Sequence, residues 1–109
     1  MTDQYVLVLS TLPSPNPAPS RLARTLVEER LAACGHVIGP IRSVYRWEGA
    51  VHDEPEARVA LHTRRSLVPA VVARTTELHP YDIPCVIAMS LKDGNPEYLR
   101  WIVDETREP

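Results

Sequence analysis

The chain has 109 residues, 44% of them hydrophobic, and a formal net charge of −2 at pH 7, which together predict one soluble domain spanning residues 1–109. Because the balance of charges is nearly even and the sequence pI is about 6.1, we expect neither nucleic acid nor a membrane surface as a partner. The two cysteines do not form a spaced framework, so we expect both thiols to be reduced. The sequence shows neither a basic and apolar leader nor an apolar run of about 20 residues, and we therefore expect a cytoplasmic protein.

The first predicted element is a strand, because residues 5–12 form a continuous apolar run typical of a strand covered on both faces. Prolines at every second position from Pro13 to Pro19 then predict an extended loop. A helix is predicted from Ser20 onward, ending at Gly35, which tolerates the left-handed backbone that follows many helices. Its apolar stripe, at spacings of three or four residues, consists of Ala23, Leu26, Val27, Leu31 and Cys34.

A long hairpin is predicted next. Residues 41–47 alternate in the manner of a strand, Glu48 and Gly49 form the turn, and residues 57–63 return after the connecting segment 51–55. Each arm could exceed ten residues, whereas globular strands usually have about 5–6. A domain of this size cannot cover such an arm, so we expect other copies of the chain to cover it.

The second half of the chain predicts two helices around one strand. Ser66 is expected to cap a helix that tolerates Pro69 in its first turn and ends at His79, because a residue before proline avoids the helical region. Residues 85–91 read as the fourth strand. Asn95 then predicts the N-cap of a last helix that reaches about residue 105.

The resulting order of elements is β-α-β-β-α-β-α. This order predicts an α+β fold, a ferredoxin-like β-α-β-β-α-β sandwich with an extra C-terminal helix and a long hairpin between its second and third strands.

Several motifs occur together in this order: RTLVEERLAACGHVIGPIRSVYRWEG at residues 24–49, HPY at 79–81 followed by Pro84, and GNPEYLRW at 94–101. Over residues 6–105 the chain resembles the CutA family, the divalent-cation tolerance proteins. The resemblance implies a ferredoxin-like subunit, a tight homotrimer related in architecture to the PII signalling proteins, and binding of copper or another divalent cation in a metal response. It implies no enzymatic reaction and does not indicate a downstream protein partner.

Two residues are candidate metal ligands. His79 comes first, because it lies at a join between helix and strand that can open toward a cleft between subunits; the alternative is a ring that hydrogen-bonds a backbone carbonyl. Cys34 is the cysteine of the LAAC motif and suits copper as a soft ligand, but it would otherwise be a small buried apolar residue. The histidines of the chain, His36, His52, His62 and His79, show no spacing typical of a preformed metal site.

The chain also departs from the family pattern. Cys85 replaces an acidic residue that commonly follows Pro84, and His36 stands where the family more often has Asn. His62 and Ala50 replace two lysines, which removes positive charge, so any anionic ligand would be held differently from the way relatives hold it.

The second candidate site consists of aromatic residues of the hairpin and of the HPY motif, together with a glutamate of the hairpin turn. We expect Tyr45, Trp47, Glu48 and Tyr81 to line a ligand cleft or a subunit interface. Tyr45 and Trp47, with Tyr98, would otherwise form a surface for stacking, and the interface is favoured because Trp and Tyr are enriched in interfaces.

Other classes of function fit less well. A small enzyme acting on a phosphorylated or anionic metabolite is the main alternative, but the chain has only four glycines and no Gly-rich anion-binding loop, nor a plausible Ser-His-Asp or Cys-His pairing. An RNA-binding module of the same strand order would need aromatic central strands and a basic surface. A metallochaperone would need an exposed CxxC motif, which the sequence lacks.

Overall fold

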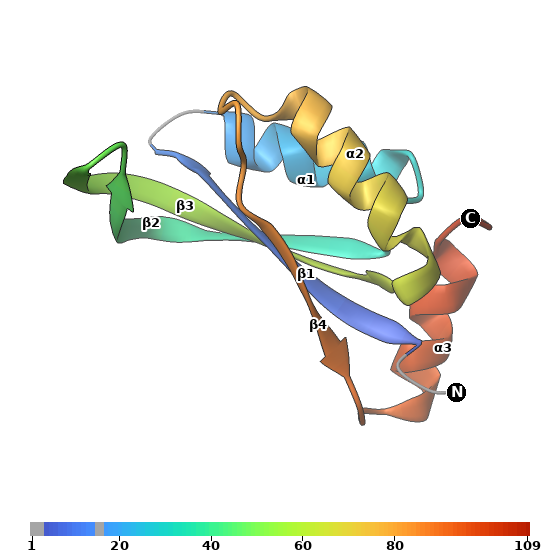
Figure 1. The fold of residues 1–109 in the computed structure, drawn as a ribbon. Helices are drawn as coiled ribbons and strands as arrows, with labels where there is room; N and C mark the ends of the chain where they lie inside the picture. The colour runs from blue at the N-terminus through green and yellow to red at the C-terminus, as the bar shows by residue number, and fades with distance from the viewer. Residues whose placement is uncertain (1–3, 15–16) are drawn as a thin grey trace.

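The computed structural model describes residues 4–14 and 17–109. Within these residues the chain forms a four-stranded antiparallel sheet in the order β2-β3-β1-β4, with helices against it (Figure 1). The elements are β1 (Tyr5–Pro13), α1 (Ala18–Glu28), β2 (Cys34–Trp47), β3 (Ala50–Arg64), the 3-10 helix η1 (Arg65–Leu67), α2 (Val68–Leu78), β4 (Val86–Leu91) and α3 (Pro96–Glu105). The predicted order and the ferredoxin-like α+β class are confirmed. None of the described helices is long and apolar enough to cross a membrane.

The core lies between one face of the sheet and the helices α1 and α2, which both cover that face (Figure 1). β1 pairs with β3 on one side and with β4 on the other, so it is a central strand of the sheet. Its burial alternates residue by residue, because successive side chains point to opposite faces. Val6, Val8 and Leu12 are fully buried with Leu26 and Val71, so in the subunit only one face of β1 is covered, not both as predicted.

The opposite face of the sheet is largely open. Leu7 pairs directly with Met89 and Leu9 with Ile87, so these four side chains share the face that α1 and α2 leave uncovered. Ile87 is 54% exposed and Met89 is 46% exposed. A subunit of this fold therefore carries an apolar surface on its sheet.

The helix α1 is shorter than the predicted one. It ends at Glu28 rather than at Gly35, because Arg30 takes a positive φ of 61°, and Leu31 turns back to donate its N–H to the carbonyl of Leu26 at 2.9 Å. Leu31 is buried although it lies outside the helix. Its position in the apolar pattern of the sequence therefore reflects burial and not helical structure. The predicted proline loop also ends early, since Pro19 lies in the first turn of α1; Pro15 lies outside the described residues.

Gly35 is a strand residue rather than a helix end. A Cβ at this position would lie 3.0 Å from the Leu61 side chain and 3.1 Å from the Cβ of Ala23. The residue is therefore needed for close packing of β2 beneath α1, and not for the left-handed backbone that the sequence suggested.

The hairpin turn is confirmed. Glu48 and Gly49 have φ values of 50° and 81° and connect Trp47 directly to Ala50, its cross-strand partner; positive φ at both positions is what a two-residue turn of this kind requires. β2 has 14 residues and β3 has 15, so both arms exceed ten residues as predicted. Segment 51–55 belongs to β3 and is not a separate connection.

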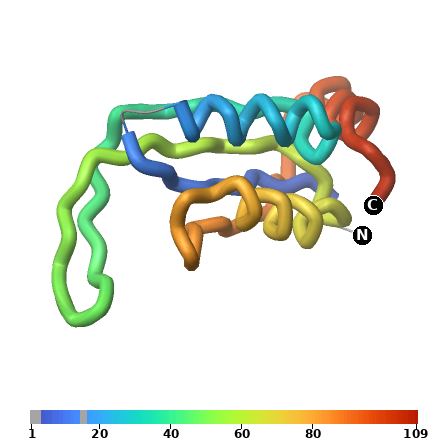
Figure 2. Tube along the Cα trace, turned by 90° about the horizontal axis from the view of Figure 1, so that it is seen from above, coloured from blue at the N-terminus to red at the C-terminus, as the bar shows by residue number. Residues whose placement is uncertain are grey.

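The arm of this hairpin bends away from the rest of the sheet (Figure 2). The cause is a break in register between Ile38 and Ile41: Ile38 pairs with Arg58, but Ile41 pairs with Glu56. Two residues of β2 therefore lie opposite one of β3, which is a β-bulge, and a bulge bends the strand that carries it.

The remaining helices begin and end close to prediction. Ser66 lies in η1 and not at the cap of α2, whose N-cap is Leu67 without a side-chain hydrogen bond. His79 ends α2 in an extended conformation as predicted, and β4 begins one residue later than expected, at Val86. Asn95 caps α3, where its Oδ1 accepts the N–H of Glu97 at 2.9 Å, as predicted.

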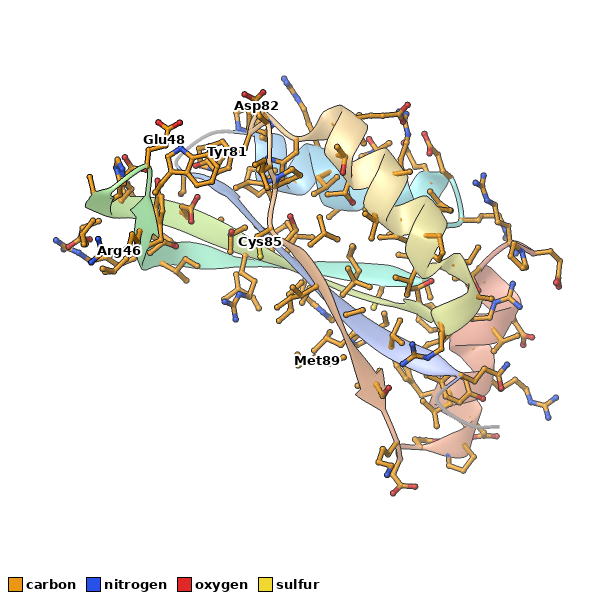
Figure 3. All side chains as sticks on the ribbon, viewed as in Figure 1. Arg46, Glu48, Tyr81, Asp82, Cys85 and Met89 are labelled. Atoms are coloured by element: carbon orange, nitrogen blue, oxygen red, sulfur yellow. The ribbon has the colours of Figure 1, made fainter. Side chains whose placement is uncertain are left out.

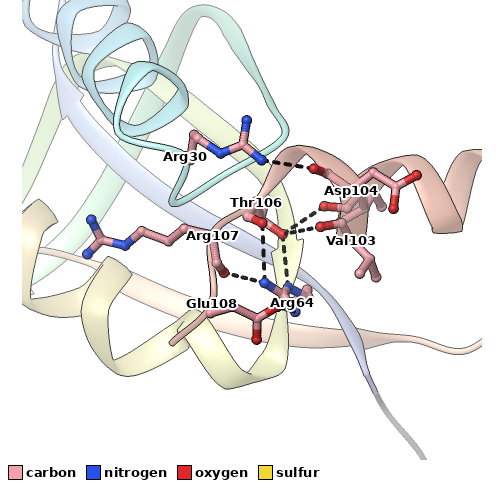
Figure 4. Close-up of polar contacts among 8 residues, drawn as sticks. Arg30, Arg64, Val103, Asp104, Thr106, Arg107 and Glu108 are labelled. Atoms are coloured by element: carbon pink, nitrogen blue, oxygen red, sulfur yellow. Dashed lines mark hydrogen bonds and ion pairs between the residues drawn. The ribbon is translucent and has the colours of Figure 1, made fainter.

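The C-terminal end of α3 is fixed by the buried side chain of Arg64 (Figure 4). Its guanidinium donates to the hydroxyl of Thr106 at 2.9 Å and also to the backbone carbonyls of Thr106 and Arg107. Arg30 donates to the carbonyl of Asp104 at 2.9 Å. These bonds join the C-terminal end of α3 to the end of β3 and to the turn after α1.

Candidate metal site

The first residues of β2 and the last residues of β3 bring a cysteine and two histidines together. Cys34 lies directly opposite His62 in the ladder, and His36, two residues along β2, points to the same face as Cys34. His62 also pairs with Leu7 on β1. Because directly paired residues point to the same face of a sheet, the group lies on the open face with Leu7. Among the described residues, one ligand atom from each of Cys34, His36 and His62 lies within 4.8 Å of the others.

Tyr98, in the first turn of α3, contacts two members of this group through its hydroxyl. Its Oη lies 3.3 Å from the Sγ of Cys34 and 2.8 Å from the Nδ1 of His62. The Sγ and the Nδ1 are themselves 3.3 Å apart. The ring of His62 meets the rings of His36 and Tyr98 edge to face, with centroids 5.4 and 5.8 Å apart. Three elements, β2, β3 and α3, therefore contribute to one cluster.

The protonation states of the cluster follow from its partial burial. Burial lowers the pKa of His62, and the neighbouring His36 lowers it further. Burial and the hydrogen bond with Cys34 raise the pKa of Tyr98 to about 12. Near neutral pH the imidazole of His62 is therefore neutral, which is the form that binds metals, and the phenol of Tyr98 keeps its proton.

The donor set fits a borderline or soft cation. One thiol and two imidazoles are ligands of zinc and copper, and this group contains no carboxylate, which magnesium and calcium prefer. Cys34 and His62 are half-buried, whereas His36 is exposed, so an ion from solvent can reach the group past His36.

His79 lies elsewhere and is engaged differently. Its Nε2 donates to the carbonyl of Thr11 at 2.7 Å, and its Nδ1 accepts the backbone N–H of Tyr81 at 3.1 Å. Thr11 pairs with Arg58, four residues along β3 from His62, so the two ligands predicted from the sequence do not come together. Because both ring nitrogens have backbone partners, the geometry favours a structural role for His79, and the ligand role stays a prediction.

The second predicted site is a groove between the arm and the segment that follows α2. Three of its four predicted residues, Tyr45, Trp47 and Tyr81, line this groove, whose volume is about 690 Å³. Glu48 lies at the tip of the hairpin (Figure 3) and does not line the groove. Cys85 also lines it, so the wall of the groove carries a thiol at this position.

The two tyrosine hydroxyls of the groove each donate a hydrogen bond to a glutamate. The hydroxyl of Tyr45 donates to Glu54 at 2.7 Å, and that of Tyr81 donates to Glu56 at 2.8 Å. Glu56 is only 4% exposed, and burial together with this carboxylate raises the pKa of Tyr81. The ordered, neutral phenols give the groove an aromatic wall suited to packing, either against a ligand or against another protein surface.

Comparison with known proteins places these observations in a family. The family model described as CutA1 divalent ion tolerance protein matches residues 6–105. The chain is 39% identical over 100 residues to the divalent-cation tolerance protein CutA of Thermus thermophilus, covering 92% of this chain and 96% of that protein. It is 41% identical over 103 residues to the chloroplastic CutA 1 of Oryza sativa subsp. japonica, covering 94% of this chain but only 58% of the rice protein.

Solved structures agree with the sequence relatives. The crystal structure of CutA1 from Oryza sativa matches with a TM-score of 0.93 at 40% identity, covering 99% of this chain and 98% of that one. The CutA1 structure from Thermus thermophilus matches with a TM-score of 0.91 at 37% identity, covering 94% and 99%. The chain spans about half the length of several curated relatives, 58% of the rice protein and 46% of the mouse protein CutA.

Proposed function

Because the chain belongs to the CutA1 divalent ion tolerance family, we propose that it contributes to metal tolerance by binding a divalent cation at Cys34, His36 and His62. The observation that carries this proposal is the approach of three ligand atoms to within 4.8 Å of one another. A cytoplasmic location stays a prediction.

Copper is the proposed cation. Copper(II) stands at the top of the affinity order of divalent metals and favours imidazole, and the thiol of Cys34 also suits copper(I). Zinc takes the same ligands and would be the main competitor. Magnesium and calcium are expected to bind far more weakly.

Calorimetric titration under anaerobic conditions tests this assignment, with zinc(II) used beside copper(II) because zinc does not oxidise a thiol. Cys34→Ser and His62→Gln should each weaken zinc binding about tenfold or more. His52→Gln is the matched control, since His52 lies on the hairpin arm, stacked on Tyr45, and should bind like wild type. Unchanged affinity in both Cys34→Ser and His62→Gln would contradict the site.

His79→Gln separates the two ligand assignments. A variant that keeps its affinity for metal but unfolds more easily supports the structural role of His79. A variant that stays folded, judged by circular dichroism, yet loses metal binding supports the ligand role predicted from the sequence.

We also propose that the chain acts as a homotrimer with an architecture like that of the PII signalling proteins. The apolar open face with Ile87 and Met89, and an arm on which Trp47 is 45% exposed, support burial of these surfaces by other copies of the chain. In that assembly the aromatic groove would lie at or near a subunit boundary, and a downstream partner could respond to changes in it.

A further inference from the structure

Tyr98 contributes an oxygen to the cluster that the sequence motifs do not mark as a ligand. Its Oη forms a triangle with the Sγ of Cys34 and the Nδ1 of His62, with edges of 3.3, 3.3 and 2.8 Å. No third residue separates these atoms, since each is within hydrogen-bonding distance of the other two.

The size of this triangle matches the spacing of ligands around one ion. Zinc–sulfur bonds of about 2.3 Å and zinc–nitrogen or zinc–oxygen bonds of about 2.0–2.2 Å place tetrahedral ligand atoms roughly 3.3–3.6 Å apart. The two edges that end at the Sγ of Cys34, 3.3 Å each, lie at the lower end of that range, and the 2.8 Å edge between Tyr98 and His62 lies below it. An ion bound to Cys34 and His62 would therefore lie within bonding reach of the Tyr98 oxygen after an outward shift of about 0.5 Å or less.

The fold also holds Tyr98 in this position. Its ring packs against His62 and against Trp101, with centroids 5.8 and 5.3 Å away. Asn95 caps the helix three residues before it, and Arg64 fixes the far end of the same helix. A ligand held from both ends of its helix loses little conformational freedom when a metal binds.

We propose that Tyr98 is the fourth ligand of the metal site, beside Cys34, His36 and His62. The site then takes a borderline cation, zinc(II) or copper(II), in a set of one sulfur, two nitrogens and one phenolate oxygen. On binding, the O–H bond of Tyr98 and the S–H bond of Cys34 break, both protons pass to solvent, and a lone pair of the oxygen and one of the sulfur bond to the metal. This inference rests on the proposed metal-binding function.

The test is a zinc(II) titration of the metal-free protein followed by ultraviolet difference spectroscopy, which detects tyrosinate, and by calorimetry. Tyr98→Phe removes only the oxygen and keeps the ring contacts with His62 and Trp101. Tyr45→Phe is the matched control, because the phenol of Tyr45 is bonded to Glu54 on the arm. Circular dichroism verifies that each variant is folded.

The expected result is a tyrosinate signal that saturates at one zinc per chain in wild type and in Tyr45→Phe. Tyr98→Phe should lack this signal and bind zinc about tenfold or more weakly. If wild type binds zinc without a tyrosinate signal and Tyr98→Phe binds equally well, Tyr98 is only a hydrogen-bonding neighbour and the inference fails while the proposed function stands. If wild type does not bind zinc at all, the proposed site and this inference both fail.

Discussion

His62 is the residue at which the sheet, the last helix and the candidate metal site meet. It pairs with Cys34 across the ladder, and its ring contacts both His36 and Tyr98. Partial burial lowers its pKa, so the folded chain favours the neutral ring. This preference prepares the side chain for a metal and also connects the stability of the metal-free protein to pH.

The free energy of unfolding of the metal-free chain should decrease as the pH falls below about 6.5, the ordinary pKa of histidine. The unfolded chain protonates His62 near that pH, whereas the folded chain does so only at a lower pH because its pKa is lowered. Between the two values the unfolded chain binds more protons, so acid favours unfolding. The stabilisation is complete above the unfolded pKa and is lost as the pH falls through the folded pKa.

Urea unfolding of the metal-free chain between pH 7.5 and pH 5 measures this effect. His62→Gln should show a smaller loss of stability than wild type over this range, whereas His52→Gln on the exposed arm should behave like wild type. An equal loss in wild type and His62→Gln would show that burial of His62 does not contribute to the acid sensitivity.

At the scale of single elements, α3 positions Tyr98 beside Cys34 and His62 in the proposed metal site. Its N-terminus is well specified by the sequence: Asn95 is the cap, Pro96 takes the first helical position, and Glu97 lies favourably in the first turn. Its C-terminal end is fixed by Arg64 and Thr106. Loss of the cap is therefore expected to disturb the position of Tyr98 in the proposed metal site.

Asn95→Ala should lower the free energy of unfolding by about 1 kcal/mol, because the N–H of Glu97 loses its acceptor. Zinc affinity should also decrease, since Tyr98 lies in the turn that the cap holds. Asn95→Asp keeps an oxygen acceptor at the cap and is the matched control, with stability and affinity near wild type. Urea unfolding and calorimetry on the same samples measure both effects, and a fully stable Asn95→Ala would contradict the role of the cap.

The hairpin shows how far the sequence predicts the site. Its two-residue turn at Glu48 and Gly49, its long arms and its alternation all follow from local residue pattern. If the two strands pair without interruption from the turn onward, Ile41 lies opposite Glu56, as observed. The same regular pairing, continued to the start of β2, would place Cys34 opposite Thr63. The bulge shifts the ladder by one residue, so Cys34 pairs with His62 instead.

A shift of one residue exchanges the faces of a strand. Neither hydrophobic periodicity nor the spacing of histidines in the chain reports a bulge, so the grouping of Cys34 with His36 and His62 was not predictable from spacing alone. The apolar stripe through Leu31 added to the difficulty, because a buried turn continues it beyond the true end of α1. The regular elements and Cys34 as a candidate ligand were thus predictable, whereas the grouping of Cys34 with the two histidines, which depends on an irregularity, was not.

At the scale of the whole molecule, the arm makes the subunit elongated. Its principal extents are 43 × 24 × 22 Å and its radius of gyration is 14.3 Å, against about 13 Å for a compact domain of this length. The arm exposes Val44, Trp47 and Val51, and the sheet exposes Ile87 and Met89. Surfaces of this kind on a monomer usually mark an interface.

Light scattering at micromolar concentration should therefore give the mass of a trimer. The melting temperature of the protein should rise with protein concentration, because unfolding of a trimer requires dissociation.

Trp47→Ala should weaken assembly, since a Trp buried in an interface often contributes about 2 kcal/mol or more. Val72→Ala, which truncates an exposed apolar residue on α2, is the matched control. A stable monomer in wild type would contradict the assembly.

In the proposed trimer, the bend of the arm at the bulge would also affect the rate at which subunits exchange. A straight arm could withdraw from a neighbouring subunit along its own axis, but an arm that turns away from its sheet would have to unbend, or lose all its contacts at once, before the subunit leaves. In the proposed trimer, three such arms would each have to disengage. Exchange of subunits between trimers should accordingly be slow even when assembly is fast, so trimers formed early in the life of the protein would keep their original members.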